Sequence, residues 1–257
     1  MVRGLPEFRK YFKAYTDQYV LIGGTASDVL FDTAGLNFRA TKDFDIVLIV
    51  EALSDAFIKV FWKFIDEGGY TNRHQSTDRP QFYRFHSPTN AAFPKMLELF
   101  CRIPDGLIFN APAHLTPLPL DEESSSLSAI ILNDDYYQLV KEHCIQIQDI
   151  SIITAEGLIP LKAKAWLDQT RRKNSGEKIQ TTDIIKHRND VFRLYQLLVE
   201  GEHTTLPRVV QNDLKSFLSQ IKLEVTAHHP QELGIVGRTT AEIMVIIENY
   251  YQLEGSE

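Results

Sequence analysis

Two carboxylates open a strand that has the composition of a protein core, and this combination limits the fold more than any other stretch. Residues 44–50, FDIVLIV, are mostly β-branched and apolar, which is typical of an interior strand in an α/β sheet. Asp43 and Asp45 stand at its head, and residues i and i+2 of a strand point to the same face. Two carboxylates this close repel each other and need a cation to stay ionised together. The pattern therefore predicts a site for Mg²⁺ or Mn²⁺, with a solvated strand end of chance spacing as the alternative.

A glycine pair precedes these carboxylates. The stretch YVLIGGTASDVL, residues 19–30, predicts a strand, a turn at Gly23 and Gly24, and a helix. Glycines at such a junction let the backbone approach a ligand closely and turn N–H groups toward an anion, although they also serve simple tight turns. The G-x-G-x-x-G fingerprint and the P-loop lysine are both absent, so neither a Rossmann nor a Walker site is expected.

A third carboxylate lies further along. Glu98 stands between Leu97 and Leu99 in the stretch KMLELF, in the middle of a predicted strand. Such a side chain either faces solvent on a half-exposed sheet or joins a site. Taken alone, solvent exposure is the simpler interpretation, but Asp43 and Asp45 favour a shared site.

The order of the predicted elements indicates an α/β (α+β) protein of two domains. Helices are expected at 6–18 and 54–69 among strands at 19–24, 44–50, 81–87, 94–102 and 145–154, with an irregular segment at 104–128. From residue 155 the pattern is helical, at 155–172, 181–200, 209–222 and 239–251. We therefore predict a mixed-sheet domain at 1–153 and a helical domain at 154–257.

Composition excludes several classes of protein. The 257 residues carry a net charge of −7, with 44% apolar and 24% charged residues, which is ordinary for a globular protein and argues against a surface coated with nucleic acid. Cys101 and Cys144 lack metal-site spacing and are read as reduced thiols. The N-terminus lacks the apolar run of a signal peptide, and no stretch is long enough to span a membrane, so we expect a cytoplasmic protein without a membrane partner.

The three acidic positions and the glycines together resemble the nucleotidyltransferase superfamily of the polymerase-β type. The matching residues are Gly23-Gly24-Thr25, Asp43-Phe44-Asp45 and Glu98. The C-terminal half adds a resemblance to AbiEii/AbiGii-like nucleotidyltransferase toxins, which carry a lysine on one helix and a K-x-x-x-D pair on the next. Lys162 falls at the first lysine, and Lys186 and Asp190 fall at the pair. The resemblance covers residues 18–200, and the last fifty residues contribute nothing to it.

The resemblance implies a nucleotidyltransferase fold followed by a helical domain. It also implies metal-dependent transfer of an NMP, or of a short nucleotide tail, from an NTP to an acceptor such as tRNA or protein, in a toxin–antitoxin or abortive-infection toxin. It assigns the metal to Asp43, Asp45 and Glu98. It assigns nucleotide binding to five positions, Gly23, Gly24, Thr25, Lys162 and Lys186, and a further catalytic role to Lys162 and Asp190. A toxin of this kind would have a cognate antitoxin as its partner. The alternatives are a small-molecule acceptor, as in antibiotic-modifying nucleotidyltransferases, and a non-catalytic module of the same fold that binds a partner.

Overall fold

The computed structural model describes residues 2–70, 82–100, 130, 131, 133–223 and 230–253. The chain divides into two compact units, one of residues 1–132 and 140–154, the other of residues 133–139 and 155–257. The main division falls between Thr154 and Ala155, where the strands end and the long helices begin. The segment predicted to be irregular, 104–128, and Cys101 lie outside the described residues.

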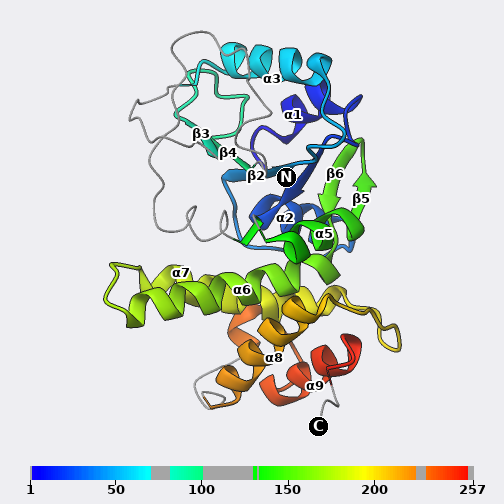
Figure 1. Ribbon diagram of the computed structural model, residues 1–257, viewed down its shortest axis with the longest axis vertical. Coiled ribbons are helices and arrows are strands. Elements are labelled where there is room, and N and C mark those ends of the chain that lie inside the picture. Colours follow the sequence, from blue (N-terminus) through cyan, green and yellow to red (C-terminus); the bar gives the residue numbers. More distant parts are fainter. Residues whose placement is uncertain (1, 71–81, 101–129, 132, 224–229, 254–257) are drawn as a thin grey trace. The chain divides into compact units, whose positions relative to one another are not determined.

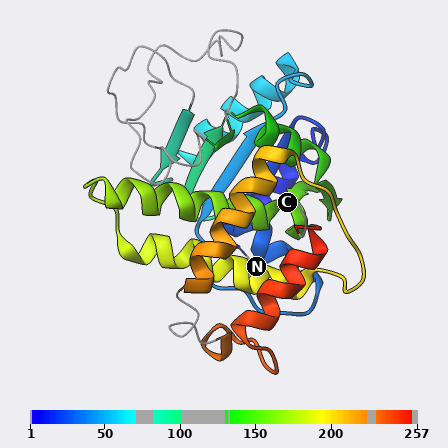
Figure 2. The ribbon, with the colours of Figure 1, turned by 60° about the horizontal axis from the view of Figure 1, so that its bottom comes forward.

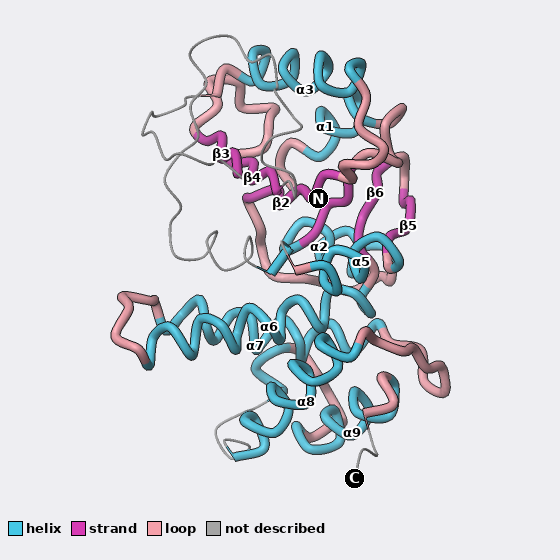
Figure 3. The backbone as a smooth tube through the Cα atoms, in the orientation of Figure 1, coloured by secondary structure: helices cyan, strands magenta, loops and turns pink. Residues whose placement is uncertain are grey.

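The first unit is built on a six-stranded mixed sheet, which confirms the α/β class. Its strands lie in the order β3-β4-β2-β1-β6-β5 (Figure 3). They are β1 (Tyr19–Ile22), β2 (Asp43–Leu48), β3 (Phe82–His86), β4 (Met96–Phe100), β5 (Cys144–Ile147) and β6 (Ile150–Ile153). β2 runs parallel to β4 and β1 parallel to β6, whereas β1 with β2, β3 with β4 and β5 with β6 are antiparallel.

One face of this sheet is covered by aromatic side chains. Helices α1 (Leu5–Phe12) and α3 (Asp55–Gly68) lie on one side of the sheet, and α2 (Gly23–Thr33) lies on the other (Figure 1). Phe8 of α1 packs against Phe44 of β2 with ring centroids 5.4 Å apart. Phe44 is fully buried and alternates with Asp43 and Asp45 along β2. The two carboxylates therefore belong to the opposite face of the strand.

The second unit is helical. It contains α6 (Ala155–Asn174), α7 (Thr181–Leu194), α8 (Arg208–Leu223) and α9 (Thr240–Tyr250), with short 3₁₀ turns at Tyr195–Leu197 and Pro230–Leu233. α6 and α7 run side by side in both ribbon views (Figures 1 and 2). Trp166 of α6 meets Phe217 of α8 edge to face, with ring centroids 5.2 Å apart. Within the described residues, no helix combines the length and the apolar character that crossing a membrane requires.

A proline removes one hydrogen bond from the backbone of α6, and a tyrosine side chain replaces it. Pro160 has no N–H, so it cannot donate the helical hydrogen bond to the carbonyl of Glu156, four residues earlier. The hydroxyl of Tyr251, a fully buried residue, donates to this carbonyl at 2.8 Å instead. The carbonyl thus keeps a partner, and Tyr251 fastens the end of the chain's last helix to α6.

Most elements predicted from the sequence are present, with four differences. The predicted helix at 6–18 ends at Phe12, and α2 begins at Gly23 itself, without a separate glycine turn. The predicted strand at 145–154 is a hairpin, because Gln148 and Asp149 take positive φ angles of 49° and 63° and reverse the chain. Helix α5 (Asp134–Glu142) was missing from the prediction, and its first residues belong to the helical unit.

Candidate functional site

The three predicted carboxylates lie on neighbouring strands of the first unit. Asp45 of β2 is opposite Glu98 of β4 in the parallel register, and opposite Ile22 of β1 on its other side. Asp43 precedes Asp45 by two residues on the same face of β2, and both are half-buried. The sheet therefore brings Asp43, Asp45 and Glu98 to one end of one face, as the sequence predicted.

The glycines are packed directly against this acidic end. Gly23 follows Ile22, the residue paired with Asp45, and takes a positive φ of 66°. A Cβ atom at position 23 would lie 1.9 Å from Oδ2 of Asp45. At Gly24, a Cβ atom would lie 2.4 Å from the hydroxyl oxygen of Thr41. A Cβ atom at position 23 would overlap the carboxylate of Asp45 as it is placed, so glycine there permits both the positive φ and this close packing.

Thr25 links the start of α2 to β2 through a hydrogen bond of its side chain. Its side chain is fully buried, and its hydroxyl donates to the main-chain carbonyl of Asp43 at 2.8 Å. Ser27, which is also fully buried, donates to the carbonyl of Gly23 at 2.9 Å. The bond of Thr25 holds the first turn of α2 against the head of β2, whereas the bond of Ser27 lies within α2. The geometry gives Thr25 a positioning role, because its hydroxyl already points to the protein backbone.

Glu98 has a cationic neighbour that the sequence alone did not identify. Nε of Arg84 donates to Oε1 of Glu98 at 2.6 Å, and Nη2 of Arg84 contacts the same oxygen. Arg84 lies on β3 directly opposite Glu98. The sequence did contain a hint of this contact. Arg84 is the central residue of the strand FYRFH, as Glu98 is the central residue of the strand MLELF, and the two strands pair at these central positions.

The chemistry of this end of the sheet suits a hard divalent cation. Two adjacent carboxylates, Asp43 and Asp45, are the oxygen donors that Mg²⁺ uses when phosphate oxygens and water complete its shell. The carboxylate of Asp45, one of these donors, fills the place that a side chain at position 23 would take. Within the part of the chain that the structure describes, no group of three or more His, Cys, Asp or Glu side chains is arranged to hold a metal ion. Because Arg84 engages Glu98, we take Asp43 and Asp45 as the candidate pair of metal ligands.

The predicted residues of the helical unit form a buried ion pair. Nζ of Lys162 on α6 lies 3.4 Å from Oδ2 of Asp190 on α7, with side-chain exposures of 9% and 0%. Nη1 of Arg193 lies 3.4 Å from the other oxygen of Asp190. Lys186, half-buried, lies one turn before Asp190 on α7. The structure thus brings Lys162 and Asp190 together within their own unit, and a contact of Lys162 or Lys186 with a nucleotide at Asp43 and Asp45 stays a prediction.

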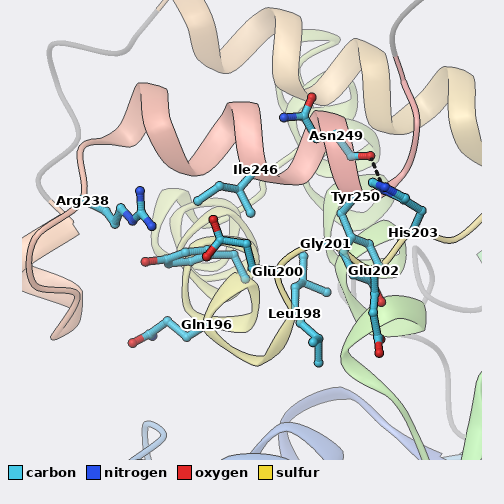
Figure 4. Close-up of a pocket in the computed structure, with 12 residues that line it drawn as sticks. Gln196, Leu198, Glu200, Gly201, Glu202, His203, Arg238, Ile246, Asn249 and Tyr250 are labelled. Atoms are coloured by element: carbon cyan, nitrogen blue, oxygen red, sulfur yellow. Dashed lines mark hydrogen bonds between the residues drawn. The ribbon is translucent and has the colours of Figure 1, made fainter.

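A cavity of about 450 Å³ lies elsewhere in the helical unit (Figure 4). Its lining includes Tyr195, Glu200, Arg238 and Tyr250, and the ring of His203 lies 3.2 Å from the carbonyl of Asn249. The described residues that line it include none of the predicted site residues. Its rim is formed by exposed charged side chains of both signs, so the cavity indicates no particular ligand.

No protein-family model matches the chain, and no curated protein matches it. The case for a function therefore depends on the residues at the acidic end of the sheet.

Proposed function

We propose that the protein is a metal-dependent nucleotidyltransferase that moves an NMP from an NTP to an acceptor such as tRNA or protein. The single observation that carries this proposal is the contact of Gly23 with Asp45. A side chain at position 23 would collide with the carboxylate, so the first residue of α2, a helix end that carries N–H donors, lies directly against a candidate metal-binding carboxylate. An NTP needs both, because its phosphates bind N–H groups and a divalent cation.

Asp43 and Asp45 would hold Mg²⁺ or Mn²⁺ together with phosphate oxygens of the NTP. Bound there, the cation would neutralise phosphate charge and orient the triphosphate. The N-terminal turn of α2 contains no acidic residue and begins with two glycines, so its N–H groups can donate hydrogen bonds to the phosphate oxygens. Thr25 keeps that turn in register with Asp43.

The transfer itself needs one bond formed and one broken. The acceptor hydroxyl oxygen attacks the α-phosphorus as the bond to the pyrophosphate oxygen breaks, and the hydroxyl proton passes to a carboxylate of the site, Glu98 or one of the aspartates. Pyrophosphate leaves with its charge balanced by a cation, a role that the resemblance gives to Lys162, while it gives Lys186 a part in nucleotide binding. The same resemblance supports a toxin with a cognate antitoxin as the biological setting.

A non-catalytic module of the same fold is the second candidate. The observation that favours it is the ion pair of Glu98 with Arg84, which leaves two carboxylates where a three-carboxylate site was predicted. Such a module would bind nucleotide and metal without transferring the nucleotide.

One experiment distinguishes the nucleotidyltransferase from the non-catalytic module. The purified protein is incubated with Mg²⁺ and each α-³²P-labelled NTP, with total tRNA, a protein extract or hydroxyl-bearing aminoglycosides as acceptors, and Asp45→Asn serves as the control. Label transferred to one acceptor by wild type and not by Asp45→Asn supports the enzyme. Nucleotide-dependent thermal stabilisation without transfer to any acceptor supports the module, whereas no stabilisation by any NTP with Mg²⁺ or Mn²⁺ contradicts both.

A further inference from the structure

A row of side chains crosses three strands at the acidic end of the sheet. Asp45 of β2 is paired with Glu98 of β4, and Glu98 is paired with Arg84 of β3. Paired residues on adjacent strands point to the same face, so the row reads carboxylate, carboxylate, guanidinium. Arg84 therefore stands at the far end of the row from the Gly23 space.

The contact between Arg84 and Glu98 is close and largely shielded from water. Two nitrogen atoms of the guanidinium group contact Oε1 of Glu98, one of them at 2.6 Å. The side chains are 18% and 11% exposed. At such low exposure, opposite charges attract more strongly than they do at a solvated surface, and a planar guanidinium holds the carboxylate in one orientation.

We infer that Arg84 is a built-in counter-ion that keeps Glu98 out of the metal-ligand set of the nucleotide-free protein. This inference rests on the proposed function, and it deepens it by assigning the three carboxylates different tasks. Asp43 and Asp45 hold the cation, whereas Glu98 is oriented beside them by Arg84. Arg84 is thus a positioning residue that acts through Glu98.

The affinity of the site for a divalent ion should depend on Arg84 in an unusual direction. Removing a cation next to three carboxylates raises the local negative charge and releases Glu98 as a further oxygen ligand. Loss of Arg84 should therefore tighten the binding of a divalent ion, although most site substitutions weaken it. A purely structural Arg84 would not produce this gain.

The test measures Mn²⁺ binding to the nucleotide-free protein by electron paramagnetic resonance and calorimetry. We expect Arg84→Gln to bind Mn²⁺ roughly tenfold more tightly than wild type, since a charge pair at this exposure changes a binding equilibrium by about that factor. Arg84→Gln/Glu98→Gln should lose the gain. Lys63→Gln, which breaks an exposed pair with Glu67 in the same unit, controls for the change in net charge and should leave the affinity unchanged.

A second variant keeps the inference testable if Arg84→Gln does not fold. The double variant Arg84→Gln/Glu98→Gln removes both charges of the pair, so it should bind Mn²⁺ as wild type does, because Glu98 is not a ligand while Arg84 holds it. A loss of tenfold or more in this double variant, or equal affinity of folded Arg84→Gln and wild type, would overturn the inference. If instead no variant binds Mn²⁺, with or without NTP, the proposed function fails as well. If wild type binds Mn²⁺ and Asp45→Asn does not, the proposed function is supported even where the Arg84 variants overturn the inference.

Discussion

The backbone of Gly23 lies against the carboxylate of Asp45, so closely that a Cβ atom at position 23 would be 1.9 Å from Oδ2. The sheet register explains this approach. Ile22, the last residue of β1, is paired with Asp45, and the chain turns at the next residue with a φ of 66°. The first turn of α2 and the candidate metal-binding carboxylate are thus fixed by the same strand pairing.

We predict that Gly23→Ala weakens Mn²⁺ and NTP binding as well as stability. A positive φ costs a non-glycine residue about 1–2 kcal/mol, and the methyl group additionally pushes Asp45 from its place. Gly35→Ala is the matched control, because Gly35 has a φ of 71° and a Cβ atom there would meet no described atom within 4 Å. Urea denaturation and Mn²⁺ titration of both variants check this. Equal metal affinity in Gly23→Ala and Gly35→Ala would show that Asp45 is not part of the site.

Local patterns accounted for much of the fold. The helix predicted at 54–69 is α3, where the side chain of Ser54 accepts from the N–H of Phe57 and Gly69 ends the helix at a φ of 61°. The spacing of Asp43 and Asp45 predicted that they share one face of β2, and Phe44 between them is buried on the other face. The hairpin at Gln148 and Asp149 was not predicted, because its turn needs positive φ angles and neither residue is the glycine or asparagine that is typical of such a turn.

The site was predictable only in part. Asp43 and Asp45 could be placed on one face from spacing alone, because the strand period of two fixes it, whereas Glu98 was joined to them by the resemblance and its register with Asp45 comes from the structure. The Arg84 contact depends on which residue of β3 pairs with Glu98, and that register is a tertiary property. Likewise, Lys162 and Asp190 were identified by resemblance, but their burial and mutual contact depend on how α6 packs on α7.

The hydrogen bond from Tyr251 to the carbonyl of Glu156 should be coupled to Pro160. We predict that Tyr251→Phe destabilises the protein by about 1–3 kcal/mol, because it leaves a buried carbonyl without its donor. In a Pro160→Ala background the alanine N–H can donate to that carbonyl, so the cost of Tyr251→Phe should fall. Urea denaturation of wild type, the two single variants and the double variant gives the coupling free energy between Tyr251 and Pro160. A cost that is the same in both backgrounds would mean that Tyr251 contributes through packing alone.

Tyr250 should make stability fall at alkaline pH. Burial, followed by the charge of Glu156 and a hydrogen bond to it at 3.3 Å, raises the pKa of Tyr250 from 10.0 to about 12. The folded state therefore holds this proton more tightly than the unfolded state, so the stabilisation is complete below pH 10 and is lost as the pH rises to about 12. We expect a shallower loss of stability over this range in Tyr250→Phe, measured by urea denaturation at stepped pH. Parallel curves for the two proteins would contradict this.

The last prediction separates the structural part of the Lys162–Asp190 pair from a functional one. Asp190 is fully buried and Lys162 nearly so, and breaking a buried pair leaves an uncompensated charge. We expect Asp190→Asn to cost about 3–5 kcal/mol. Lys162→Met should cost less, because Arg193 still contacts Asp190.

The double variant Lys162→Met/Asp190→Asn should recover much of the loss, because it removes both charges, and replacing a buried pair is often nearly neutral. Lys222→Met, which breaks an exposed pair with Glu248, is the control and should cost no more than about 1 kcal/mol. Nucleotide affinity is then measured in the recovered double variant, where instability no longer obscures it. If Lys162 balances the charge of the triphosphate, this variant binds NTP with Mg²⁺ more weakly than wild type although its stability has returned. Wild-type affinity there would instead reduce the pair to a structural link between α6 and α7, and would remove the support that the helical unit gives to the proposed transfer reaction.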